Sequence, residues 1–168
     1  WQVALTSTST PTALILTRQD VPVLDRSDAT TPSNGSDPLT KGAYTISPAD
    51  NPEVILMATG SEVTLALQAQ EALKKQGVAA SVVSMPCVEI FRQQPQAYRD
   101  EVLPPSVRAR VSIEAGITPP WREFVGDGGR SIGIDHYGAS ANGSTLYREF
   151  GITVEAVVEQ ALAARDQN

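Results

Sequence analysis

The sequence predicts an α/β fold, a three-layer α/β/α sandwich around a mostly parallel, mixed sheet. The apolar run Val54–Ala58 is typical of a central strand that is buried on both faces of a parallel sheet. A helical pattern of about four turns follows it, starting at Glu62 and ending before Gly77. A second strand-like run, Ala80–Ser84, comes next. Strands that alternate with helices on short loops indicate a doubly wound sheet with helices on both faces.

The first long helix has clear signals at its start. We expect Ser61 to accept a hydrogen bond from a free amide of the first turn, and Glu62 places negative charge at the positive end of the helix dipole. Earlier in the chain, Ala43–Ser47 predicts a short strand in a hairpin-like start, which is one reason to expect a mixed sheet. The expected apolar face of the helix consists of Val63, Ala66, Leu67 and Leu73.

The second half of the chain continues the alternation. The polar stretch 92–99 suggests one or two short helices before Pro104 and Pro105 break the chain. Apolar and polar residues alternate in 107–113, which predicts a strand near a sheet edge with one face at least partly exposed. The remaining expected elements are a short strand at Ser131–Ile134, a short helix at Ser144–Phe150 and a final helix capped by Thr153.

Composition excludes several classes of function. The 168 residues are 41% hydrophobic, enough for one packed core, and they carry 13 basic and 19 acidic residues, a net charge of −6. Without a basic block, neither nucleic acid nor an anionic membrane is an expected partner. Cys87, the single cysteine, is expected to be a small core residue, and the natural setting is a reducing cytoplasm. No apolar run has the length of a membrane span, and residues 1–10 lack the pattern of a signal peptide.

The start of the chain has a different organisation. The apolar run Thr12–Thr17 predicts a buried strand that ends abruptly at Arg18. Such a strand needs neighbouring strands, yet few residues precede it and the chain begins at Trp1, so we expect a fragment. The expected division is 1–24 as the tail of a preceding domain, 25–41 as a turn-rich interdomain linker and 42–168 as a complete domain.

The loops that follow the strands offer a candidate crevice. In an open α/β sheet, ligands bind beyond the carboxyl ends of the strands, and these loops carry Thr59–Glu62, Ser84, Glu114–Gly116 and the pair Asp135 and His136. Turns and helix starts need the same residue types without any ligand, which is the alternative interpretation. Only one glycine, Gly60, follows the strand Val54–Ala58, whereas a dinucleotide-binding fingerprint needs three glycines at fixed spacing. The sequence therefore gives little support to a nucleotide site.

No catalytic residue and no metal ligand is assigned from these loops. Asp135 could orient the imidazole of His136 for proton transfer, but adjacent residues of extended backbone point to opposite faces, and a structural role is the alternative. Glu89 and Glu114 are single carboxylates, and Cys87 has no companion at a metal-ligand spacing. The sequence therefore predicts no metal site.

Arg18 is the remaining candidate. A guanidinium at the end of a buried strand lies where active sites open in α/β domains, and its fork of donors matches a phosphate or a carboxylate bidentately. A surface ion pair with Asp20 or Asp25 is the alternative, and the residues alone leave both open.

Ordered motifs along the chain resemble the transketolase family. Thr17-Arg18-Gln19 after an Ala-Leu-Ile-Leu strand, with a linker into Lys41-Gly42-Ala43-Tyr44, is similar to the junction between the pyrimidine-binding and C-terminal domains of transketolases. Asn142 stands where many relatives have proline, and it still serves as a helix start. The other stretches that resemble the family are Pro52–Val63, Val83–Pro86, Tyr98–Pro105 and Gly133–Ala141.

The resemblance implies part of a ketol transferase. Transketolases use thiamine diphosphate and a divalent cation, Mg or Ca, to move a two-carbon ketol unit from a ketose phosphate to an aldose phosphate in the pentose phosphate pathway. Arg18 matches the family's arginine for the sugar phosphate, which favours the phosphate interpretation. The family's catalytic, cofactor-binding and metal-binding residues would lie outside this chain, so it is expected to be inactive alone and to contribute contacts to a homodimer.

One motif imitates a cofactor site. Gly126-Asp127-Gly128 resembles the opening of the motif that holds metal and diphosphate in thiamine diphosphate enzymes. That motif needs a preceding strand and an asparagine at a longer spacing than Asn142 provides, so we expect a surface loop.

Other functions stay open at this point. Dihydroxyacetone synthase and deoxyxylulose phosphate synthase share the architecture. The domain could instead be an independent module that binds a nucleotide or a regulator at the strand-end crevice, or it could serve only to hold a dimer together.

Overall fold

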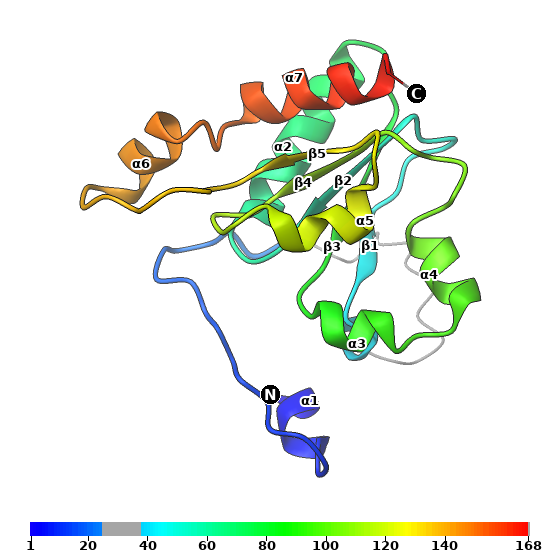
Figure 1. Cartoon of the computed structure of the whole chain (residues 1–168), viewed down its shortest axis with the longest axis vertical. Coiled ribbons are helices and arrows are strands. Elements are labelled where there is room, and N and C mark those ends of the chain that lie inside the picture. The colour runs from blue at the N-terminus through cyan, green and yellow to red at the C-terminus, as the bar shows by residue number, and fades with distance from the viewer. Residues whose placement is uncertain (25–37, 168) are drawn as a thin grey trace.

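The chain forms one five-stranded sheet. The computed structural model describes residues 1–24 and 38–167, so most of the expected linker, 25–41, lies outside the described residues. The strand order is β1-β3-β2-β4-β5; β1 is antiparallel to β3 and the other pairs are parallel, which confirms the α/β fold with a mixed sheet (Figure 1). The strands span Tyr44–Ser47 (β1), Val54–Ala58 (β2), Ala80–Ser84 (β3), Arg110–Ile113 (β4) and Arg130–Ile132 (β5).

Helices cover both faces of the sheet. α2 and α7 pack against each other on one face, and α3, α4 and α5 lie on the other (Figure 1). The α-helices span Gln2–Thr6 (α1), Glu62–Lys75 (α2), Val88–Arg92 (α3), Gln96–Val102 (α4), Arg122–Val125 (α5), Gly143–Glu149 (α6) and Val154–Arg165 (α7). Two short 3₁₀ helices span Pro38–Lys41 (η1) and Pro119–Trp121 (η2). Short helices were expected around 92–99, and α3 and α4 confirm two of them.

The central strand β2 separates two apolar clusters. Val54, Leu56 and Ala58 belong to the cluster under α2 and α7, whereas Ile55 and Met57 belong to the cluster on the opposite face. Every residue of β2 is at most 1% exposed. Burying a side chain of this size contributes about 1.5–3 kcal/mol, so both faces of β2 support the fold. This double burial is why β2 appears in the sequence as an unbroken apolar run.

Two predicted helix caps are confirmed and a third is wrong. Asn142 Oδ1 accepts a hydrogen bond from the Ser144 amide at 3.0 Å, which starts α6. Thr153 Oγ1 accepts one from an amide of the first turn of α7 at 3.2 Å. The Ser61 side chain caps no amide. Its hydroxyl donates to Glu62 Oε1 at 2.7 Å instead, because that buried carboxylate needs donors.

The strand predicted within 107–113 lies near a sheet edge, as expected, and its polar side is exposed only in part: Arg108 is exposed and Arg110 half-buried, but Ser112 is buried. β4 begins only at Arg110 and lies inside the sheet, between β2 and the edge strand β5. Ser112 is 0% exposed, and its hydroxyl donates to Ser131 Oγ of β5 at 2.7 Å. A polar side chain that is satisfied by a neighbouring strand can occupy a core position, which is why Ser112 departs from the exposed side of the alternation.

Two expectations about burial are also corrected. The run Thr12–Thr17 forms no strand, and Ile15 is 93% exposed, since no strand that the structure describes pairs with this segment. Cys87 is half-buried rather than part of the core. The segment leads back to α1, which has no buried residue and stands apart from the sheet (Figure 1).

None of the helices in the described ranges combines the length and the apolar character needed to cross a bilayer.

Candidate functional site

A depression of about 450 Å³ lies beyond the carboxyl ends of β2, β3 and β4. Thr59, Met85 and Glu114 follow these strands and line it. Ile15 of the N-terminal segment also borders it. The predicted crevice is therefore present in part, but Ser84, Asp135 and His136 are not among its lining residues.

The ionisable side chains of this depression are engaged in structural bonds. Glu114 Oε2 accepts a hydrogen bond from Nε1 of the buried Trp121 at 2.7 Å. Cys87 Sγ donates to Glu89 Oε2 at 3.5 Å. No group of three or more His, Cys, Asp or Glu side chains within residues 1–24 and 38–167 is arranged to hold a metal ion. Nothing in this lining favours a charged ligand.

A buried carboxylate at the start of α2 organises a second cluster. Glu62 is 4% exposed, and its Oε1 accepts hydrogen bonds from Ser61 Oγ and from the Tyr147 hydroxyl. Its Oε2 accepts one from the Ala115 amide at 3.2 Å. Burial raises the pKa of Tyr147, and the hydrogen bond to Glu62 raises it further. This cluster joins the loops after β2 and β4 to α6.

The sequence does not reveal this cluster. At the first turn of a helix, Glu62 is fully explained by the helix dipole, and nothing in the pattern of α6 distinguishes Tyr147. The two residues are 85 positions apart and only the tertiary fold brings them together.

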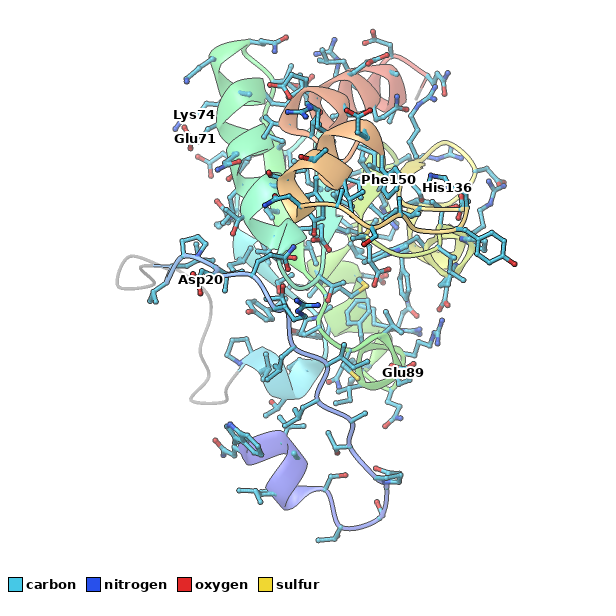
Figure 2. The ribbon with its side chains drawn as sticks, turned by 90° about the vertical axis from the view of Figure 1, so that its left-hand side faces the viewer. Asp20, Glu71, Lys74, Glu89, His136 and Phe150 are labelled. Carbon is cyan, nitrogen blue, oxygen red and sulfur yellow. The ribbon has the colours of Figure 1, made fainter. Side chains whose placement is uncertain are left out.

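Asp135 and His136 lie elsewhere and do not act on each other through a hydrogen bond in the described structure. Asp135 accepts from the amide of Thr118 at 2.8 Å and from its hydroxyl at 2.6 Å. His136 and Phe150 are labelled in Figure 2. The His136 ring stands edge-on to the Phe150 ring, with the ring centroids 4.7 Å apart, and its Nδ1 lies 2.8 Å from the Tyr137 carbonyl oxygen. These contacts favour structural roles for both residues.

The Asp135 carboxylate provides a pH-dependent prediction. The hydrogen bonds from Thr118 lower the pKa of Asp135, so its stabilising effect exists above the ordinary value of about 3.9 and is lost as pH falls through the lowered folded value. We expect Asp135→Asn to be less stable than wild type at neutral pH, and the difference to close below about pH 4. Urea unfolding at several pH values measures it. Asp50→Asn, at another exposed aspartate, is the control, and a pH-independent difference for Asp135→Asn would contradict the prediction.

Arg18 is exposed and available to a ligand. No ion pair joins it to Asp20 or to any other residue in the part of the chain that the structure describes, and Asp25 lies outside that part. Thr17 Oγ1 donates to Gln19 Oε1, and the Gln19 amide donates back to Thr17 Oγ1 at 3.3 Å. Both bonds lie within the short turn and leave the Arg18 guanidinium unused.

Comparison with known proteins identifies the domain. Residues 42–153 match the family model of the transketolase-like TK C-terminal domain. The chain belongs to the transketolase family. It is 50% identical over 165 residues to the transketolase of Geobacillus stearothermophilus, an alignment that covers 97% of this chain and 24% of that protein.

Solved transketolase structures share the fold. The transketolase from Leishmania mexicana superimposes with a TM-score of 0.73 at 38% identity, over 81% of this chain and 20% of the other. A Pichia stipitis transketolase in complex with sedoheptulose-7-phosphate gives 0.71 at 34% identity, over 79% and 19%. The chain spans about a quarter of the length of the curated relative it matches.

Three carboxylates of the described part of this transketolase-family chain, those of Asp127, Glu62 and Glu114, are engaged by groups of the protein itself. Asp127 of the Gly126–Gly128 stretch has a side chain that is 90% exposed and pairs with Arg122 at the surface, which confirms the predicted surface loop. The carboxylates of Glu62 and Glu114 are bonded to protein donors. No chemical step of the cofactor is therefore assigned to these residues.

Proposed function

We propose that this chain is the C-terminal part of a transketolase that transfers a two-carbon ketol unit from a ketose phosphate to an aldose phosphate. Residues 42–168 are its C-terminal domain, 25–41 its interdomain linker, and 1–24 the tail of its pyrimidine-binding domain. The single observation that carries this proposal is 50% identity to a transketolase across 97% of the chain. A relative solved with sedoheptulose-7-phosphate supports sugar phosphates as the substrate class.

Within this proposal, the chain is a structural and substrate-binding part rather than a catalytic one. Thiamine diphosphate and the divalent cation are bound by other parts of the enzyme, as the resemblance to the family implies. The described residues hold no group of three or more His, Cys, Asp or Glu side chains arranged for a metal ion. The domain contributes contacts to a cytoplasmic homodimer, and the chain alone has no ketol transfer activity. Arg18 is its one residue that touches substrate.

Arg18 suits a sugar phosphate for physical reasons. A guanidinium presents paired N–H donors whose spacing matches two phosphate oxygens, and its charge persists at any physiological pH. Since Arg18 is exposed and has no carboxylate partner among the described residues, binding a phosphate breaks no existing ion pair. The phosphate stays remote from the carbon–carbon bond that reacts, so this contact is equally strong in the ground state and the transition state.

Arg18→Ala in the full-length enzyme tests the proposal. We expect the KM for a phosphorylated ketose to rise about ten- to thirtyfold with little change in kcat, because a charge-assisted hydrogen bond common to both states is lost. Steady-state kinetics with a phosphorylated and an unphosphorylated ketose measure this effect. Arg108→Ala, at another exposed arginine, is the control. An equal loss with both ketoses would contradict a phosphate role for Arg18.

A further inference from the structure

Two large hydrophobic side chains are exposed on neighbouring loops of the domain. Among the described residues 42–167, Ile117 and Tyr137 are the large hydrophobic residues with high exposure, 60% and 99%. Ile117 follows β4 and Tyr137 follows β5, so both lie beyond the carboxyl ends of parallel strands. Ile117 also lines the depression of about 450 Å³, together with apolar side chains such as Met85 and Val88. Single exposed hydrophobic residues are ordinary on a protein surface, but two on adjoining loops beside an apolar depression are not scattered.

The two loops are fixed against each other. The Ile134 amide donates to the Gly116 carbonyl oxygen at 2.7 Å, and the Thr118 amide donates to Asp135 Oδ1 at 2.8 Å. A Cβ on Gly133 would lie 2.5 Å from the Gly116 oxygen, so the two backbones are in direct contact. The exposed side chains therefore stand on one ordered surface, which loses little conformational entropy when a partner binds.

The two loops carry no Asp, Glu, Lys or Arg side chain. This holds for residues 115–121 and 136–147, whereas 19% of the whole chain is charged. The carboxylates that flank the first and second loop, Glu114 and Asp135, already accept hydrogen bonds from side chains or amides of residues 115–121. Depletion of charge around exposed hydrophobic residues is typical of the core of a protein–protein contact.

The second loop also projects from the domain. Residues 135–142 are all exposed, and α6, which follows them, has no buried residue. Figure 1 shows this part of the chain running out beyond the sheet to α6. Its course is nevertheless fixed at both ends, by Asp135 and by the Asn142 cap. A loop that is ordered but contacts little of its own domain is well placed to contact another.

We propose that the β4–β5 loop surface, which consists of Ile117 and residues 136–142, docks on the pyrimidine-binding domain of the same polypeptide. This inference rests on the proposed function, in which that domain precedes the linker 25–41. The alignment with the curated relative covers 97% of this chain but 24% of that protein, so most of a protein of that length lies outside this chain. A short linker holds two domains at a millimolar effective concentration, so a modest contact surface is enough.

A second copy of the domain suits this surface less well. The interfaces of homodimers are more apolar than other contact surfaces, and two large hydrophobic side chains are few for such a core. Contacts between domains of one chain are smaller and more polar than those of permanent dimers. Residues 138–142, Gly-Ala-Ser-Ala-Asn, suit a contact of this kind, since their small side chains permit close approach and two of them are polar.

Tyr137→benzoylphenylalanine, a photoreactive replacement in the full-length enzyme, tests the docking. Tyr137 is 99% exposed, so the replacement removes almost no contact within the domain. We expect illumination to link this side chain to the pyrimidine-binding domain of the same polypeptide, with no doubling of mass on a denaturing gel. Lys75→benzoylphenylalanine is the matched control. Lys75 is exposed at the end of α2, at the opposite edge of the sheet, and should give little linking.

Cysteine labelling of the native full-length enzyme gives a second readout. We expect Ile117→Cys to react with a maleimide at least about tenfold more slowly than Lys75→Cys, because the docked domain covers it. Adding Tyr137→Asp is expected to speed the labelling of Ile117→Cys about tenfold, since an unpaired carboxylate in a desolvated contact favours the undocked state. Peptide mass spectrometry separates this thiol from that of Cys87.

Three outcomes would overturn the docking: linking at Tyr137 to a second subunit, linking no stronger than at Lys75, or labelling of Ile117→Cys as fast as that of Lys75→Cys. None of these readouts uses activity, so they are independent of the kinetic test of Arg18. A full-length protein without ketol transfer activity contradicts the proposed function, whereas an active enzyme whose β4–β5 loop surface is free contradicts the docking alone.

Discussion

Arg110→Met is expected to lower the free energy of unfolding by about 3 kcal/mol or more, because it leaves several partly buried carbonyl groups without their donors. The half-buried Arg110 guanidinium donates to four backbone oxygens: Nε to Val107 at 2.9 Å, Nη1 to Phe124 at 2.9 Å, and Nη2 to Leu103 at 3.0 Å and Pro104 at 2.9 Å. These bonds join β4 to the end of α4 and to α5. Burial lowers the pKa of Arg110, yet an arginine stays protonated at any physiological pH.

Urea unfolding of the 168-residue chain measures this effect, and the fluorescence of the buried Trp121 reports it. Arg108→Met is the matched control, since Arg108 has the same side chain two residues earlier and is exposed. Arg110→Lys is expected to recover only part of the stability, because one ammonium group cannot reach carbonyls that approach from several directions. Equal stabilities for Arg110→Met and Arg108→Met would contradict the prediction.

Gly42→Ala is expected to cost about 2–5 kcal/mol of unfolding free energy. Gly42 has a φ of +80°, where an L-residue loses about 1–2 kcal/mol. An added Cβ would also lie 2.4 Å from the Cys87 carbonyl oxygen and 2.5 Å from the Phe91 amide nitrogen. Both are backbone atoms of or next to α3, so the overlap can be relieved only by shifting that helix, at a further cost of about 1–3 kcal/mol.

Gly77→Ala separates the two causes. Gly77 follows α2 with a nearly equal φ of +78°, but a Cβ there meets no atom within 4 Å. It should therefore show the backbone cost alone, about 1–2 kcal/mol. Urea unfolding of both variants measures the difference, and a Gly42→Ala variant as stable as Gly77→Ala would show that α3 moves aside freely.

Local signals explain what could be predicted from the sequence. The Val54–Ala58 strand is recognisable because burial on both faces requires an unbroken apolar run, and the caps at Asn142 and Thr153 depend on amides only a few residues away. Residues with distant partners are misjudged. Ser112 is satisfied by Ser131, 19 positions later, and Arg110 by carbonyls from three segments, so both look like residues of a solvated face.

The candidate site also contains residues with a local sequence signal and residues without one. Arg18 is recognisable because a charged residue ends an apolar run abruptly, and its phosphate role stays a prediction until the kinetic test. The buried cluster around Glu62 is not recognisable in this way: Glu62 and Tyr147 are 85 positions apart, and no local pattern encodes the meeting of α2 and α6 that joins them. The predicted strand at 12–17 fails for the opposite reason, because an apolar run pairs only where partner strands are present.

The two borders of the sheet restrict how copies of this domain can associate. β1 offers four residues with an irregular register, and β5 offers three. These short edge strands have few unpaired backbone N–H and C=O groups. They therefore offer little for a strand of a second molecule to pair with. In the homodimer that we propose, contacts made by this domain are therefore expected to use helix surfaces and loops, and exchange of strands between molecules should be rare even at high concentration.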